Sequence, residues 1–208
     1  MNITESVTRL SNLDLNDSMS AFQHHAAQQF HGAYEVFYNF IAETKPARIL
    51  EIGTALGGFT TFLKICCDEL QLPTKILSYD IANKSWYDVI RERGIDIRVE
   101  NVFTADWSSV DQYVVDFIKD EGTTIVLCDG GYKIGEFRIL SDHLKSGDFI
   151  LAHDYARDKE FFKEYIKGRV WNWCEITDAD IQSACDKNNL KAYNSEVFET
   201  VAWCCKQK

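Results

Sequence analysis

The sequence has few of the features that divide a chain into separate units. Only two prolines occur among 208 residues, Pro46 and Pro73, and no Gly/Ser-rich linker or internal repeat interrupts the chain. A domain boundary has no obvious position, so we expect one domain over residues 1–208. We divide it into an N-terminal helical segment (1–45), a central core (46–155) and a C-terminal segment of helices and an edge strand (156–208).

Cysteine patterns typical of disulfide frameworks and zinc sites are also absent. The seven cysteines are odd in number, two pairs are adjacent (Cys66 with Cys67, Cys204 with Cys205), and no C-x-x-C spacing occurs. We therefore predict buried free thiols.

Long hydrophobic runs and an excess of positive charge are missing as well. No run approaches the roughly 18 apolar residues of a membrane span, and the polar N-terminus does not resemble a signal peptide. With 22 basic and 32 acidic side chains the formal net charge is −10, which repels phosphate backbones and anionic membranes. We expect a cytoplasmic protein that binds neither nucleic acid nor membranes, with its acidic excess on a solvated surface.

Short apolar runs alternate with helical stretches beyond Pro46. Apart from Glu51, runs such as ILEI and IVLC are continuously apolar, as expected for parallel strands buried on both faces. The pattern predicts an α/β fold with a Rossmann-like, doubly wound, mostly parallel sheet. The five expected parallel strands cover residues 47–52, 74–80, 95–102, 123–129 and 147–154.

Helices and a last strand are expected outside this core. Three- and four-residue spacing of aromatic and alanine side chains predicts an amphipathic helix over about 18–43. Two further helices are expected near 158–168 and 178–188, the second opened by a capping box of Thr177 and Asp180. The alternating segment 195–206 predicts an antiparallel C-terminal strand at the sheet edge, the sixth strand located in a sheet that we expect to have seven.

The residues that end the strands point to a ligand site, because ligands of doubly wound sheets bind outside the carboxyl ends of the strands. Glu51 and Gly53 end the first strand, followed by Gly57 before a helix, and Asp80 ends the second strand. A dinucleotide fingerprint lacks its middle glycine here, and a P-loop lacks its G-K-[ST]. The turn instead has the form E-x-G-x-x-x-G, which resembles that of the class I S-adenosylmethionine-dependent methyltransferases.

The resemblance continues along the chain and adds a branch within that family. The segments KPARILEIGTALGGFTTFL, CDGGYKIGEFRILSDHLKSGDFILAHDY and VAWCCK are similar to the branch that includes macrocin O-methyltransferase and the cephalosporin hydroxylase relatives. Two positions depart from the branch pattern: Tyr132 stands where many relatives have histidine, and Asp148 replaces the second glycine before the fifth strand.

The resemblance implies a cofactor site built by residues 46–155. Gly53, Thr54 and Gly57 would pass close to the methionine part of S-adenosylmethionine, and Glu51 would orient its amino group. Asp80 would bind the ribose, and Val102 with Phe103 would border the adenine. Asp129 would lie beside the transferred methyl group. The implied cofactor-binding residues are Glu51, Gly53, Thr54, Gly57, Asp80, Val102, Phe103 and Asp129.

The resemblance also implies a catalytic and metal cluster at the ends of the fourth and fifth strands. Asp129 and Asp154 would hold a divalent cation, with Mg²⁺ suited to such oxygen ligands. His153 would complete the coordination or take the acceptor's proton, so Asp129 and His153 are the predicted catalytic residues. Two carboxylates at neighbouring strand ends repel one another, which is a physical reason to expect a cation between them.

Structural interpretations stay open for several of these residues. Asp154 could cap the helix that follows, and His153 could be a packed imidazole. His24, Gln28 and His31 could form one helix face that covers the cofactor. The cluster Trp171-Asn172-Trp173, with Trp203, could line an acceptor pocket or pack in the core.

These features together predict methyl transfer to a small molecule, with O-methylation as the specific expectation and divalent metal assistance as a possible addition. A catalytically inactive S-adenosylmethionine-binding module is the alternative, and a nicotinamide-dependent oxidoreductase is a third reading that the missing glycine disfavours. The expected partner is the small-molecule acceptor, and a homo-oligomer is compatible with the sequence.

Overall fold

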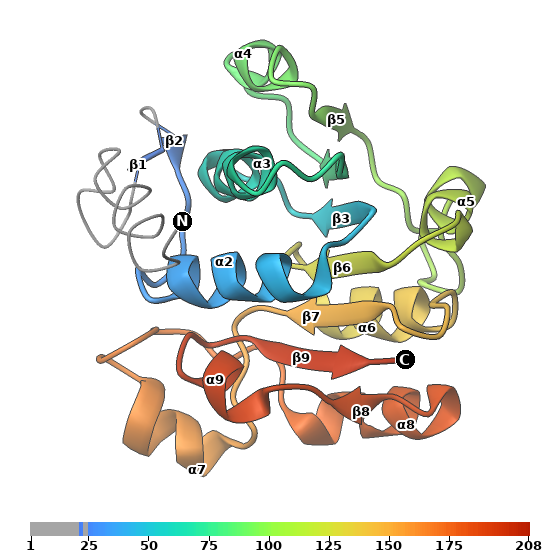
Figure 1. Cartoon of the computed structure of the whole chain (residues 1–208). Helices are drawn as coiled ribbons and strands as arrows, with labels where there is room; N and C mark the ends of the chain where they lie inside the picture. The colour runs from blue at the N-terminus through green and yellow to red at the C-terminus, as the bar shows by residue number, and fades with distance from the viewer. Residues whose placement is uncertain (1–20, 23–24) are drawn as a thin grey trace.

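The computed structural model describes residues 21–22 and 25–208, and they form a central sheet between two layers of helices (Figure 1). Seven strands are bonded in the order β5-β4-β3-β6-β7-β9-β8. The first five along the chain are parallel, and β9 is antiparallel to both of its neighbours. These strands are β3 (Arg48–Ile52), β4 (Lys75–Asp80), β5 (Asp96–Val99), β6 (Thr124–Cys128), β7 (Phe149–Ala152), β8 (Lys191–Ala192) and β9 (Cys204–Gln207). The predicted fold class is confirmed.

Helices cover both faces of the sheet, which is why every position of the central strands β3 and β6 is buried and most of their residues are apolar. Successive side chains of a strand point to opposite faces, so Ile49 packs in one core and Leu50 in the other. The first core is closed by α2 (Ala33–Thr44), α3 (Gly58–Glu69), α4 (Tyr87–Arg91) and α9 (Ser195–Glu199). The second is closed by α5 (Gln112–Lys119), α6 (Lys133–Ser141) and α8 (Asp178–Asn188).

The N-terminal helix begins later than predicted. Residues Ala21–Phe22 (β1) and His25–Ala26 (β2) pair as short antiparallel strands, and Gln28 has a left-handed φ of 53° that a helix cannot contain. The helix α2 then starts at Ala33. The predicted positions 18–20 and 23–24, including His24, lie outside the described residues. Gln28 and His31 lie before α2, so the helical face predicted for these two residues is wrong.

The C-terminal segment also differs from its expected form. Ser195–Glu199 is helical as α9, and the last strand is limited to Cys204–Gln207. Phe198 in α9 and Val201 just after it both pack in the first core, and their three-residue spacing is that of a helical face, not of a strand. The last strand is not at the edge, because the two-residue strand β8 lies outside it. The helices near 158–168 are α7 (Lys159–Phe161) and the π-helical turn η1 (Phe162–Ile166).

Two further expectations concern the thiols and the capping box. All seven cysteines are free, six of them buried, as predicted. Thr177 precedes α8, and its backbone N–H donates to Asp180 Oδ2 at 2.8 Å, which confirms the capping box.

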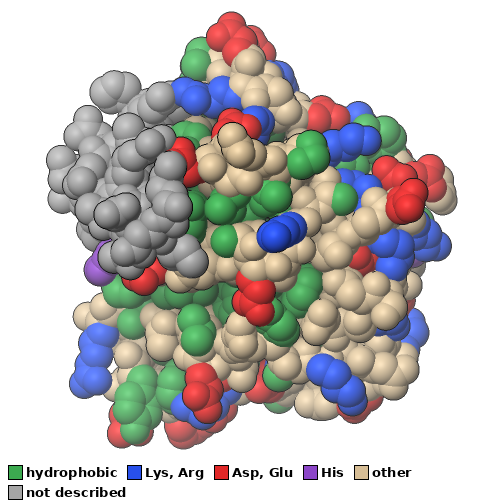
Figure 2. Space-filling view, viewed as in Figure 1, with side chains coloured by type: hydrophobic (Ala, Val, Ile, Leu, Met, Phe, Trp, Pro, Cys, Tyr) green, Lys and Arg blue, Asp and Glu red, His purple; other side chains and the backbone are tan. Residues whose placement is uncertain are grey.

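The visible surface mixes charges of both signs. Figure 2 shows acidic and basic side chains interspersed over the face seen in Figure 1. In the part of the chain that the structure describes, no helix has both the length and the apolar character needed to cross a bilayer.

Candidate functional site

The carboxyl ends of β3 and β6 meet where the order of strand addition reverses. The chain adds β4 and β5 on one side of β3 and then returns to its other side as β6. The residues after these two strands are held together, since the Asp129 N–H donates to the Ile52 carbonyl at 2.9 Å. Ligands of doubly wound sheets bind at this switch point, so the predicted site lies where the fold favours one.

Gly53 allows the closest approach of the two strand ends. It has a left-handed φ of 99°, and a β-carbon on it would lie 2.2 Å from the Asp129 carbonyl oxygen. Only glycine fits both the conformation and the space. Gly57 is also left-handed, at 78°, but it opens α3, and a β-carbon there would meet the Ile90 side chain at 2.3 Å.

Glu51 lies beneath the turn and joins three elements. Its Oε2 accepts a 2.6 Å hydrogen bond from the Thr60 hydroxyl of α3 and another from the Ser78 hydroxyl of β4. The Thr54 hydroxyl lies 2.6 Å from Ser78 Oγ. Burial raises the pKa of Glu51 to about 7, although these hydrogen bonds act in the opposite direction.

A second buried carboxyl, Glu136 of α6, holds the loop after β6. Its Oε2 and Oε1 accept hydrogen bonds of 3.1 Å from the N–H groups of Gly130 and Tyr132. Burial raises the pKa of this carboxyl to about 7 as well, against the lowering effect of the two backbone bonds. Glu51 and Glu136 thus fix the two turns that form the switch point.

These two carboxyls predict that the protein becomes less stable as pH rises. Each pKa is raised from 4.5 to about 7 on folding, so the stabilising contribution is complete below pH 4.5 and is lost as pH rises through 7. The difference is up to about 3 kcal/mol of unfolding free energy per carboxyl. We expect Glu51→Gln to flatten the decline measured by denaturant unfolding between pH 4.5 and 7. Glu35→Gln, at an exposed position of α2, is the control.

Asp80 ends β4 and braces the glycine turn. Its Oδ2 accepts from the Ala55 N–H at 2.7 Å, and its Oδ1 accepts from the Ala82 N–H at 2.8 Å. The Tyr87 hydroxyl lies 3.1 Å from Oδ2. The carboxylate also faces the larger of two cavities at this edge of the sheet.

This first cavity has a volume of about 390 Å³, within the size range of small-molecule sites. Predicted residues from four strand ends line it, namely Gly53, Asp80, Val102, Phe103 and Asp129. Trp107 stacks on Phe103 with ring centroids 4.7 Å apart, and Tyr132 meets Trp107 edge-on. The cavity therefore combines an aromatic part with the carboxylates of Asp80 and Asp129 in its wall.

A second cavity of about 250 Å³ adjoins the first. Gly53, Ala55 and Asp129 line both cavities. Glu51 and Thr54 line the second, whereas Gly57 lines neither, so its contact with a cofactor stays a prediction. Trp171 and Trp173 form part of its wall, together with Ala27 and Gln28 from the segment before α2.

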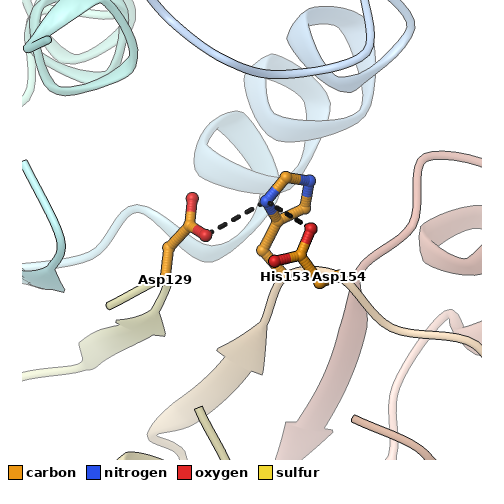
Figure 3. A group of neighbouring side chains, drawn as sticks. All are labelled: Asp129, His153 and Asp154. Atoms are coloured by element: carbon orange, nitrogen blue, oxygen red, sulfur yellow. Dashed lines mark hydrogen bonds and ion pairs between the residues drawn. The ribbon is translucent and has the colours of Figure 1, made fainter. Parts of the chain in front are cut away.

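Asp129, His153 and Asp154 converge as predicted at the inner end of the second cavity (Figure 3). His153 Nδ1 lies 3.1 Å from Asp129 Oδ1 and 3.7 Å from Asp154 Oδ1. The imidazole lies between the rings of Trp171 and Trp203, each with its centroid 4.8 Å away. Its Nε2 is buried and has no hydrogen-bond partner among the described residues.

The capping alternative for Asp154 is wrong. Asp158 caps α7 instead, with its carboxylate accepting from the Phe161 N–H at 2.7 Å. Asp154 has a left-handed φ of 55° and directs its carboxylate into the cluster, where Trp171 Nε1 donates to Oδ1. Burial acts to raise the pKa of Asp154, but His153 and Lys133 lower it below its usual value.

Lys133, which the sequence patterns did not single out, is the cation of this cluster. Its Nζ lies 2.7 Å from Asp154 Oδ2 and 3.7 Å from Asp129 Oδ1. Burial lowers its pKa, but the two aspartates outweigh this effect and raise the pKa above its usual value. Atoms of Asp129, His153 and Asp154 lie within 4.8 Å of one another, close enough to share a metal ion. The Lys133 ammonium lies beside the same two carboxylates that a divalent ion would use.

Gln29 is a second residue that the sequence patterns did not identify. Its Nε2 donates to Asp129 Oδ2 at 2.9 Å, and its Oε1 accepts from Trp203 Nε1 at 2.8 Å. Trp203 is fully buried, so its packing interpretation is correct, while Trp171 and Trp173 line a cavity. His31 is exposed, and of the described residues predicted to cover the cofactor only Gln28 lines the second cavity.

Comparisons with known proteins identify the fold. No protein-family model and no curated protein sequence matches the chain. A solved structure of CmcI described with "Mg-SAM" aligns over 94% of this chain and 80% of its own, with a TM-score of 0.60 and 13% identity. An O-methyltransferase family protein from Burkholderia thailandensis aligns over 85% of this chain and 56% of its own, with a TM-score of 0.53 and 8% identity. CurJ carbon methyltransferase aligns over 100% of this chain and 61% of its own, with a TM-score of 0.52 and 11% identity. At these identities the similarity shows a fold shared with methyltransferases.

Proposed function

We propose that this protein is an S-adenosylmethionine-dependent methyltransferase that acts on a hydroxyl group of a small molecule. The observation that supports the proposal most is the pair of adjoining cavities with Gly53, Ala55 and Asp129 in their common wall. Two ligands bound there would meet beside the Asp129 carboxylate, which is the arrangement that a group transfer between them requires.

The first cavity suits the cofactor. Its aromatic end at Phe103 and Trp107 would accept a purine, and the Asp80 carboxylate would accept ribose hydroxyls. The Ala55 N–H already donates to Asp80, so it does not serve as a donor to a pyrophosphate. This supports a cofactor without phosphates over a nicotinamide dinucleotide.

The second cavity suits a small acceptor. Its aromatic wall of Trp171 and Trp173 faces a polar wall that includes Asp129, Lys133 and Glu175. Similarity to O-methyltransferases and to a carbon methyltransferase leaves the acceptor atom open, so O-methylation is supported by the polar wall and by the resemblance of the motifs. A hydroxyl placed against this wall would have a carboxylate within reach.

Each group would have a defined part in the reaction. When bound, S-adenosylmethionine supplies an electrophilic methyl group, whose S–C bond breaks as the new C–O bond forms and leaves a neutral thioether. Asp129 is 19% exposed and lines both cavities, so it would accept the hydroxyl proton. His153, which is 2% exposed, contacts Asp129 and would position it.

Calorimetry tests the cofactor half of the proposal. We expect micromolar binding of S-adenosylmethionine and its demethylated product, roughly 8 kcal/mol of binding free energy. Asp80→Ala should weaken binding by on the order of 1.5 to 3 kcal/mol, because it removes a charged acceptor of hydrogen bonds. Asp88→Ala, which removes an exposed carboxylate paired with Arg91 on α4, should bind like the parent.

A screen of hydroxyl compounds with methyl-labelled cofactor tests the transfer. Transfer of label to any acceptor would support an enzyme and exclude the catalytically inactive binding module. Cofactor binding without transfer to any member of a broad panel would favour that module. Equal binding by the parent and Asp80→Ala would place the cofactor site elsewhere.

A further inference from the structure

We propose that the ammonium of Lys133 is a built-in cation of this site, and that it takes the position between Asp129 and Asp154 that a divalent metal ion would otherwise occupy. The proposal concerns this chain's own side chains. Its metal-binding part is independent of the proposed function, whereas its consequence for catalysis rests on methyl transfer.

The Lys133 ammonium has an acceptor for each of its N–H groups. Lys133 is buried, with 6% of its side chain exposed. Its Nζ lies 2.7 Å from Asp154 Oδ2, and it donates to Glu175 Oε2 at 3.1 Å and to the Gly130 carbonyl at 3.0 Å. An ammonium has three N–H groups, and three acceptors surround this one. Such a lysine occupies a defined site and is not a surface charge that only passes near acidic residues.

All four carboxylate oxygens of Asp129 and Asp154 already lie next to a nitrogen atom. Asp129 Oδ1 faces His153 Nδ1, and Asp129 Oδ2 accepts from Gln29. Asp154 Oδ1 accepts from Trp171 Nε1, and Asp154 Oδ2 faces Lys133. Each of these oxygens keeps one lone pair beside its close donor, so a metal ion that binds both carboxylates must approach on the sides that the four donors leave open.

The electrostatics of the cluster also favour the lysine. The carboxylates of Asp129 and Asp154 repel one another unless a positive charge lies between them, and the Lys133 ammonium supplies this charge from the first turn of α6. A divalent ion placed on the same carboxylates would be repelled by Lys133 at a few ångströms, inside a partly buried site where charges interact strongly. The lysine that stabilises the cluster therefore also excludes a metal ion.

The Lys133 ammonium would also act on the acceptor. Lys133 lines the second cavity together with Asp129, so its positive charge lies beside the place proposed for the acceptor hydroxyl. A fixed positive charge there would stabilise an oxygen that is losing its proton, which is one of the effects that a metal ion has in other enzymes. Lys133 is thus a positioning and electrostatic group, while Asp129 takes the proton.

Titration with metal ions alone tests the proposal without any need for turnover. The folded protein is titrated with Mg²⁺ by calorimetry and with Mn²⁺ by electron paramagnetic resonance of the free ion. We expect no saturable binding by the parent at millimolar concentration. Lys133→Met keeps an unbranched apolar side chain and removes the charge, and it should bind either ion at least about 100-fold more tightly than the parent.

Two further variants make the outcome specific. Asp154→Asn added to Lys133→Met should abolish the gained binding, because it removes one of the carboxylates. Lys159→Met removes a lysine bonded to the Cys174 carbonyl, outside the cluster, and should bind no metal. Saturable binding by the parent that Asp154→Asn removes would overturn the proposal. Unchanged binding in a folded Lys133→Met would overturn it too.

If Lys133→Met fails to fold, metal titration of the parent and of Asp154→Asn still tests the proposal, because saturable binding by the parent that Asp154→Asn removes would overturn it. It is also separate from the test of function. A protein that does not bind S-adenosylmethionine but shows the predicted metal titrations would refute the methyltransferase and retain the lysine cation. If transfer is found, chelation with EDTA should leave the turnover of the parent unchanged, and a large loss on chelation that Mg²⁺ restores would overturn the catalytic part.

Discussion

Gly53→Ala is expected to abolish cofactor binding and to destabilise the fold. The new β-carbon would lie 2.2 Å from the Asp129 carbonyl oxygen, which belongs to the backbone and has no rotamer to change. Alanine is also strained at a φ of 99°. Both effects push the ends of β3 and β6 apart, so the loss should reach about 3 kcal/mol of unfolding free energy. Denaturant unfolding and calorimetry with S-adenosylmethionine measure the two effects.

Gly131→Ala is the matched control for stability. A β-carbon on Gly131 has no other atom within 4 Å, and its φ is not left-handed. It lies two residues after Asp129 in the same loop, so it tests whether any alanine near the switch point has the same effect. We expect its unfolding free energy to stay within about 0.5 kcal/mol of the parent. A folded, cofactor-binding Gly53→Ala would contradict the assignment of the switch point as the site.

The strands of the sheet could be predicted because their environment leaves a simple pattern. A strand buried on both faces is largely apolar, and runs such as ILEI and IVLC follow that pattern, with Glu51 as the exception. The N-terminal helix was misplaced because aromatic spacing continues across residues 25–32, where Gln28 turns the chain with a left-handed φ. Side-chain periodicity does not report a backbone break of this kind.

The candidate site was predictable to the extent that strand ends determine it. Asp129, His153 and Asp154 follow neighbouring strands, so parallel topology alone brings them together. Lys133 carries a weaker signal, its spacing of four residues from Asp129 at the start of a helix. Lysines at such positions are usually solvated, and this one is buried only because Glu175 and Asp154 arrive from distant segments.

Gln29 had no sequence signal at all. Its contact with Asp129 joins residues 100 positions apart, and its other contact, with Trp203, joins residues 174 apart. A glutamine before a helix is an ordinary surface residue in isolation. Its contact with Asp129 depends on tertiary packing that brings the segment before α2 and Trp203, just before β9, next to the end of β6.

Asp129→Asn is expected to reduce turnover by about 100-fold while cofactor affinity stays close to that of the parent. A general base typically contributes 100-fold or more, and an amide at this position has almost no basicity. The asparagine would also direct an NH₂ group toward either Gln29 Nε2 or His153 Nδ1, because both carboxylate oxygens now face nitrogen atoms. Single-turnover rates with labelled cofactor, alongside calorimetry, separate the chemical step from binding.

Asp68→Asn is the matched control, since it removes an exposed carboxylate paired with Lys64 on α3 and should leave turnover unchanged. Gln29→Ala provides a graded comparison. It removes one contact to Asp129 but keeps the carboxylate, so it should lower turnover by less than Asp129→Asn does. If Asp129→Asn keeps the turnover of the parent, the proton goes to another group, and Asp129 is only a structural partner of His153 and Lys133. Loss of cofactor binding in Asp129→Asn, with turnover normal at saturating cofactor, would instead make Asp129 a cofactor ligand, because the missing interaction would act on the ground state.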